Sequence, residues 1–195
     1  MSRVAIQCVL ISAVCAGFGI ALMVALAQIS AVPLATIPFA TSIVLVAGAP
    51  RSAPARTKAI IFGHLICALL GMAMHYSGME ETATVAVAVG VSVAIMIAFD
   101  VFHPPAGITP LVLYGSAYDW TFLLVPVLAG AVSVAILART AQKLIDLAEA
   151  AQADKAVPAS GGGKTDYITM ILDCSGRGSF PFFSVSHAAN GSHER

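Results

Sequence analysis

Five long runs of the sequence carry no charged side chain, and they limit the chain to one class of protein. The runs cover residues 4–29, 31–49, 59–79, 82–99 and 120–138. A helix needs roughly 18 to 20 apolar residues to cross the hydrocarbon core of a membrane, and these runs have that length. A soluble core could not hide five of them, because the chain has only 195 residues, 58% of them hydrophobic and 10% charged. The sequence therefore predicts an integral membrane protein built from helices.

The first run resembles a secretory signal peptide in its basic start at Arg3 and in the small residues Ala25 and Ala27. Its apolar stretch, however, is much longer than the roughly 7 to 15 residues of a signal peptide. We therefore expect an uncleaved membrane helix.

The few charged residues predict the orientation of the chain. The 51–58 loop carries three basic residues and no acid, and further basic residues follow the last run from Arg139 onward. Basic residues concentrate on the cytoplasmic side of a membrane. We therefore place both termini and the 51–58 loop in the cytoplasm, at a bacterial inner membrane. The loop with Glu80 and Glu81 then lies outside.

This orientation requires an extra crossing. The runs 82–99 and 120–138 both have to end in the cytoplasm, so the chain must return between them. The available apolar segment is 105–117, which begins with proline and contains glycine. About thirteen helical residues rise only about 20 Å, which is less than the roughly 30 Å of the hydrocarbon core. We predict a short or broken membrane helix there.

A segment of the same kind occurs earlier in the chain. Residues 38–48 align without gaps with residues 105–115, and Gly63 aligns with Gly130 at the same offset of 67 residues. A coincidence among common membrane residues is the alternative. A true repeat gives each half a long, a short Pro-led and a long helix, with the second half inserted upside down. Such inverted repeats are typical of transporters.

The predicted fold is an all-α integral membrane protein, a compact bundle of about five or six membrane segments in two inverted repeats. We expect a transmembrane domain over 1–140, a cytoplasmic helix extension over 141–157 and a flexible or disordered tail over 158–195.

The short helices are the predicted binding site. Their first turns leave backbone N–H groups free, and the helix dipole makes those ends electropositive. Together with nearby hydroxyl groups, these donors suit a small anion. The candidate substrate-binding residues are His103, Pro104, Pro105, Gly107, Thr109, Pro38, Thr41 and Ser42. In the alternative interpretation, proline and glycine only shape helix ends and the hydroxyl groups bond the backbone.

Ionisable residues at membrane depth are costly and are therefore candidates for function. Three of them, Asp100, His103 and His64, are candidates for a proton relay. A charged His103 would help an anion or carry a proton, and Asp100 would keep it charged. The alternatives are interfacial capping by Asp100 and His103, and a polar contact between helices for His64.

No set of carboxylates, histidines or cysteines has the spacing of a catalytic or metal site. We therefore expect no enzymatic activity, no metal and no other cofactor. Cys8, Cys15 and Cys67 lie in the apolar runs and Cys174 lies alone in the tail, so we expect the three in the runs to pack as small apolar residues.

Three blocks of sequence resemble one known family. They are PFATSIVLVAGAPRS at 38–52, FHPPAGITPL at 102–111 and WTFLLVPVLAG at 120–130. In this order they are similar to the HPP family of integral membrane proteins, over about residues 8–140. The resemblance implies a small helical membrane protein with a role in transport. Because some members in photosynthetic organisms are linked to nitrite movement, it also implies a small anion such as nitrite.

Three functions remain open. The chain is a transporter or channel for a small inorganic anion, nitrite foremost, or a proton-coupled transporter of another small solute, or a membrane scaffold or sensor subunit. The expected partners are the small solute, the lipid bilayer and further copies of the chain in a homo-oligomer. A formal net charge of zero gives little support for nucleic-acid binding.

Overall fold

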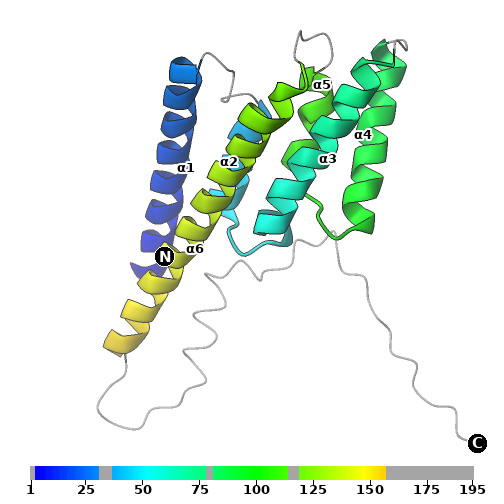
Figure 1. The fold of residues 1–195 in the computed structure, drawn as a ribbon. Coiled ribbons are helices and arrows are strands. Elements are labelled where there is room, and N and C mark those ends of the chain that lie inside the picture. The colour runs from blue at the N-terminus through cyan, green and yellow to red at the C-terminus, as the bar shows by residue number, and fades with distance from the viewer. Residues whose placement is uncertain (1–2, 31–36, 78–80, 114–118, 157–195) are drawn as a thin grey trace, which may run out of the picture.

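The computed structural model describes residues 3–30, 37–77, 81–113 and 119–156 (Figure 1). Over these ranges the chain is helical, without β-strands. Three helices are long and apolar enough to cross a membrane: Arg3–Ala25, Thr57–His75 and Pro126–Ala153. Three shorter apolar helices accompany them: Pro38–Gly48, Thr82–Ala98 and Pro104–Leu113. The predicted all-α membrane bundle is confirmed.

The first half of the chain consists of three helices. They are α1 (Arg3–Ser30), α2 (Ile37–Gly48) and α3 (Thr57–His75). A short 3-10 turn, η1 (Ala53–Ala55), lies in the loop between α2 and α3. Pro38 is the second residue of α2, where its fixed φ suits helix initiation and its missing N–H would be unpaired in any case.

The second half repeats this order of long, short and long helices. It consists of α4 (Glu81–Ala98), η2 (Pro104–Ile108), α5 (Thr109–Leu113), η3 (Leu123–Leu128) and α6 (Ala129–Ala156). Together η2 and α5 form the short segment, which begins one residue before the predicted start. The end of the predicted 105–117 helix, from residue 114, lies outside the described residues, as does the 158–195 tail. The π-helical turn η3 contains Pro126, which donates no backbone hydrogen bond.

The two halves run in opposite directions through the bundle. In Figure 1, α1 and α3 run from the lower end to the upper end, whereas α4 and α6 run from the upper end to the lower end. Each short segment packs against the third helix of the other half, since α2 contacts α6 while η2 and α5 contact α3. The repeat also relates the contact of α3 with α4 to the contact of α6 with α1. The arrangement thus has the form of the predicted inverted repeat.

Small side chains on α6 allow α2 to approach closely. The buried cluster between them contains Phe39, Ile43 and Val46 from α2, and Ala131, Val134, Ala135 and Ala138 from α6. A Cβ atom on Gly130 would lie 2.7 Å from the Phe39 ring. Membrane helices associate through such close packing, because lipid supplies little hydrophobic drive between them.

The outward surface of the bundle is apolar. Val14 is 69% exposed, Phe18 63% and Leu124 67%. A contiguous surface of such residues would be unfavourable in water but suits contact with lipid chains.

The two ends of the bundle differ in composition. The N-terminal end of α1, the α2–α3 and α4–η2 loops and the C-terminal part of α6 lie at the lower end in Figure 1. Most of the charged residues of the described chain belong to these segments. At the opposite end, the ring of Tyr76 stacks on that of Trp120 with centroids 5.5 Å apart, as expected for interfacial anchors.

Candidate functional site

His103 connects the two halves of the protein. It is the residue before η2, and its side chain is fully buried. Its Nδ1 atom lies 2.7 Å from the carbonyl oxygen of Pro54 in η1, and its Nε2 atom lies 2.8 Å from Oγ of Ser42 in α2. A carbonyl oxygen only accepts, so Nδ1 is the donor in the first of these bonds. One ring of the second half is thus held by two segments of the first.

His64 joins the same group from α3. Its fully buried ring lies with Nδ1 2.9 Å from the Ile60 carbonyl oxygen and Nε2 3.3 Å from Ser42 Oγ. The ring stacks on Phe39, with centroids 4.8 Å apart, and its centroid lies 5.0 Å from that of His103. His64 therefore makes the polar contact between helices that the sequence left open as one interpretation.

Ser42 is the centre of this group. Its buried hydroxyl lies within hydrogen-bonding distance of both histidine rings and 2.7 Å from the carbonyl oxygen of Pro38 one turn earlier. Ser42, His64 and His103 are hereafter the His–Ser–His cluster. Because α2, α3 and the residue before η2 each contribute one side chain, the cluster forms only when the two halves are docked.

Two glycines at matching repeat positions make this docking close. A Cβ atom on Gly63 would lie 2.9 Å from Cβ of His103, and one on Gly130 would lie 2.7 Å from the Phe39 ring. Each glycine thus allows the third helix of its own half to approach the start of the other half's short segment. This observation favours a true repeat over a coincidence among common residues.

Four other predicted residues lie around the starts of the short segments. Pro38 and Pro105 are buried, whereas Pro104 is exposed. Thr41 is exposed, and its hydroxyl donates to the Pro38 carbonyl oxygen at 3.1 Å. The prolines therefore shape the two starts, and this hydroxyl contact with the backbone is the one that the alternative interpretation expects.

The segment from Gly107 to Thr109 has space and an unused hydroxyl. Apart from Gly107 itself, its chain neighbours and its own helix backbone, no atom of the described residues lies within 4 Å of the position that a Cβ on Gly107 would take. The Thr109 side chain is only 5% exposed, yet its Oγ1 has no hydrogen-bond partner among the described residues. A buried hydroxyl without a partner is uncommon and costs about 1–3 kcal/mol. This makes Thr109 a candidate for contact with a solute.

Asp100 is paired differently from the sequence-based expectation. Its backbone is in the left-handed region, with φ 52°, where the chain turns between α4 and η2. The exposed carboxylate accepts a hydrogen bond from Lys58 Nζ at 2.6 Å and lies 3.6 Å from Arg56. These contacts, the hydrogen bond with Lys58 foremost, lower the pKa of Asp100. The expected pairing of Asp100 with His103 is therefore replaced by an ion pair with the α2–α3 loop and the start of α3.

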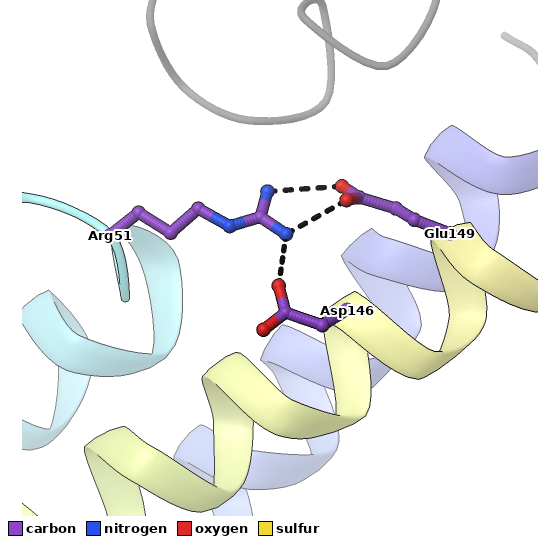
Figure 2. A network of polar contacts seen from close by, with 3 residues as sticks. All are labelled: Arg51, Asp146 and Glu149. Carbon is purple, nitrogen blue, oxygen red and sulfur yellow. Dashed lines mark hydrogen bonds and ion pairs between the residues drawn. The ribbon is translucent and has the colours of Figure 1, made fainter.

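A second ion-pair network at the same end was not predicted. Arg51 in the α2–α3 loop donates to both oxygens of Glu149, at 3.1 and 2.8 Å, and also to Asp146 (Figure 2). Glu149 is only 8% exposed, and its hydrogen bond with Arg51 is the main cause of the raised pKa of Arg51. The spacing of the two acids on one face of α6 is a signal in the sequence, but it does not identify their partner.

Two further residues of the site also escaped sequence reasoning. Pro54 contributes only its carbonyl oxygen, which leaves no side-chain signature. Phe39 follows the first proline of the repeat and has a ring that packs on His64. An aromatic residue in an apolar run does not by itself indicate a polar neighbour.

In the described part of the chain, no three His, Cys, Asp or Glu side chains lie close enough together to hold a metal ion. Cys8, Cys15 and Cys67 are buried within helices.

Comparison with known proteins identifies the family. Residues 1–149 match the family model described as HPP, transmembrane region. The chain belongs to the HPP family. Two proteins of Dictyostelium discoideum, both named only as transmembrane proteins, are each 32% identical to it over 108 residues. These residues make up 51% of this chain but only 38% and 35% of the two relatives, so the match spans little more than a third of their length. No solved structure matches the chain.

Proposed function

We propose that this HPP-family protein moves a small inorganic anion, nitrite foremost, across the membrane, and that it does so without catalysing a reaction. The main support is the His–Ser–His cluster, a buried polar group contributed by both halves. Transporters with inverted repeats bind their solutes where the repeats meet, next to short or interrupted helices. Buried ionisable residues inside a membrane are also typical of solute or proton pathways.

Donors in the cluster and on the short segment that follows His103 suit an anion that accepts hydrogen bonds. The Thr109 hydroxyl has no partner among the described residues and can donate to an anion, whereas the Ser42 hydroxyl and an imidazole N–H can do so once their present contacts open. None of these donors is a permanently charged lysine or arginine. Weak, multiple contacts allow an anion to bind and still leave. Nitrite is preferred over other small anions because some members of the HPP family are linked to its movement.

Transport requires the site to open. In the present conformation Ser42, His64 and His103 are fully buried. At the charged end, Arg51 ties the α2–α3 loop to α6, and Lys58 ties the start of α3 to Asp100. Both links join the first half to the second. We expect them to break when the cluster opens toward that end.

Uptake into proteoliposomes tests the proposal. Nitrite, nitrate, formate and chloride are offered separately, with protein-free liposomes as the control for leakage and a pH-sensitive dye inside. His103→Ala and Thr109→Val should depress nitrite uptake, and Gly107→Leu should block it by filling the open space. His75→Ala, at the opposite end of α3, is the matched control and should transport as the wild type does.

The possible results separate the three functions. If the site variants transport nitrite normally, the segment formed by His103, η2 and α5, hereafter the HPP segment, has only a structural role and the proposed site is wrong. Uptake of another solute driven by a pH gradient, without nitrite uptake, would favour the proton-coupled alternative. A wild-type protein that is folded but inactive toward every solute would favour a scaffold or sensor.

We propose that the charged end faces the cytoplasm of a bacterial inner membrane, with both termini on that side. The α2–α3 loop and the start of α3 lie at this end, and they carry three basic residues, as the preference of such residues for the cytoplasm would require. Single cysteines at positions 2 and 81 of a cysteine-free variant, treated with a membrane-impermeant reagent, test it. Labelling of position 2 from outside would reverse the orientation. We further propose a homo-oligomer, which a strictly monomeric mass in lipid nanodiscs would contradict.

A further inference from the structure

The contacts of the two histidine rings show which of their nitrogen atoms carry a hydrogen. Nδ1 of His64 lies 2.9 Å from the Ile60 carbonyl oxygen, and Nδ1 of His103 lies 2.7 Å from that of Pro54. Because carbonyl oxygens only accept, both Nδ1 atoms carry a hydrogen. In a neutral imidazole the other nitrogen then carries none. Both Nε2 atoms are therefore acceptors when the rings are neutral.

Both of these acceptors face the same hydroxyl. Ser42 Oγ lies 2.8 Å from Nε2 of His103, 3.3 Å from Nε2 of His64 and 2.7 Å from the Pro38 carbonyl oxygen. A hydroxyl has a single hydrogen to donate, so three acceptors compete for it. Among the described residues, at least one Nε2 atom is thus left without a donor although both rings are fully buried. When both rings are neutral, the cluster therefore lacks a hydrogen to donate to at least one of the two Nε2 atoms.

We propose that the His–Ser–His cluster is a binding site for a single proton, which it takes up together with the transported anion. A proton on Nε2 of His103 donates to Ser42 Oγ, and the Ser42 hydroxyl is then free to donate to Nε2 of His64 or to the Pro38 carbonyl oxygen. His103 is the site of protonation because its contact with Ser42 is the shorter one, 2.8 against 3.3 Å. A second proton is opposed because the two ring centroids are only 5.0 Å apart.

The charge of the bound proton explains why an anion would accompany it. A buried imidazolium is unfavourable without a counter-charge. α2 contains no ionisable side chain. The ionisable side chains described on α3 and in the α2–α3 and α4–η2 loops have partners of their own: Lys58 and Arg56 with Asp100, Arg51 with Asp146 and Glu149, Cys67 with Met96, and His75 with Tyr76. Hydroxyl, carbonyl and ring contacts therefore surround the cluster, so the anion itself supplies the negative charge. Proton and anion then raise each other's affinity by the same factor. This coupling rests on the proposed anion transport, whereas the proton site itself does not.

Nitrogen-15 NMR of the full chain, labelled at histidine and held in lipid bilayers, tests the proposal. The resonance of an imidazole nitrogen differs widely between its bare and its protonated form. The chain has five histidines, which single substitutions assign. Spectra are recorded between about pH 8 and pH 5, with and without sodium nitrite, across the range in which histidine ordinarily titrates. His75→Gln is the control that removes a distant ring.

We expect both cluster Nε2 atoms to be bare at the alkaline end and one of them, that of His103, to become protonated on acidification. Nitrite should raise the pH of half-protonation by about 0.7 to 2 units, which corresponds to a typical coupling of 5- to 150-fold. His103→Gln replaces the ring by an amide that donates to Ser42 but takes up no proton. Its uptake of nitrite should therefore lose its dependence on an imposed pH gradient. If this variant does not fold, the wild-type titration still decides.

Each result supports or overturns a separate part of the proposal. Bare Nε2 atoms at every pH at which the protein is folded, with and without nitrite, refute the proton site. Protonation of both rings together refutes single occupancy. One bound proton without any effect of nitrite, in a protein that takes up no anion, keeps the proton site and refutes both coupling and anion transport. Nitrite uptake that ignores the pH gradient, with bare Nε2 atoms, refutes the proton site and leaves anion transport standing.

Discussion

Replacing Gly63 by alanine should separate the HPP segment from α3. The added Cβ would lie 2.9 Å from Cβ of His103 and 3.5 Å from the Val101 carbonyl oxygen. The atom that it meets is bonded directly to the backbone, and both nitrogens of that ring lie within hydrogen-bonding distance of another residue. Because the position of this Cβ is fixed by the backbone, no change of rotamer relieves the contact. The backbone at His103 has to shift instead, and with it the ring contacts that close the His–Ser–His cluster.

A second glycine provides the matched control. Gly90 lies inside α4, and outside its own stretch of helix no atom of the described residues lies within 4 Å of the position that a Cβ on it would take. Alanine in place of glycine inside a helix contributes about 0.5–1 kcal/mol of stability, and the two variants share this gain. Overpacking costs about 1–3 kcal/mol, and Gly63→Ala alone bears it. The two variants should thus differ in unfolding free energy by about 1–3 kcal/mol, or roughly 2 to 12 °C in Tm for a chain of this size.

Thermal unfolding of both variants and the wild type in the same detergent, followed by far-ultraviolet circular dichroism, measures this difference. Gly90→Ala should unfold at or above the wild-type temperature and Gly63→Ala below it. Equal Tm values for the two alanine variants would refute the close approach of α3 to the HPP segment, and with it the geometry of the cluster.

Three further predictions concern other parts of the molecule. Arg51→Gln should lower the free energy of unfolding by about 1–3 kcal/mol, because it leaves the nearly buried Glu149 carboxylate without its charged partner. In the same unfolding assay Asp146→Asn, at a half-exposed position, should cost less than about 1 kcal/mol. Asp100→Gly should unfold near the wild-type temperature and Asp100→Val well below it, because the φ of 52° at this position suits glycine and is unfavourable for a β-branched residue. Equal Tm values for the two variants would contradict the left-handed turn. Thr109→Val should lower nitrite uptake but leave the Tm unchanged or raise it, because it removes a buried hydroxyl that has no partner among the described residues. A clear loss of stability would show that the hydroxyl is hydrogen-bonded.

The sequence predicted the architecture because the signals for it are local. Charge-free runs reveal membrane helices from composition alone, and the proline at 105 marks the short segment because proline suits a helix start and disrupts a helix interior. The shared offset of Gly63 and Gly130 indicated a repeat, and the structure gives both glycines the same kind of close contact. Patterns of this kind do not require knowledge of which distant residues meet.

The composition of the site was harder to predict because it depends on distant contacts. Ser42 and His103 were both candidates, but they are 61 residues apart, and their contact follows only from the docking of the two halves. The Pro54 carbonyl has no side-chain signature, and Asp100 is nearest in sequence to His103 yet binds Lys58. Sequence proximity misleads at a loop such as this one, because a left-handed residue can redirect a carboxylate toward another segment.

The two halves match in shape but not in their polar side chains, and this difference accounts for the Thr109 hydroxyl, which has no partner in the described part of the chain. Under the offset of 67 residues, Ser42 matches Thr109 and His64 matches Ala131. Ser42 therefore has a histidine on α3 as a neighbour, whereas the matching position on α6 supplies only a methyl group, and Thr109 Oγ1 has no partner among the described residues. Two equivalent polar groups would give the protein two sites related by its pseudo-symmetry. With the histidines concentrated beside one short segment, ionisable chemistry occurs once, and the hydroxyl of the other segment is left to a ligand that brings its own acceptor. A single solute bound between unequal halves is what this asymmetry favours.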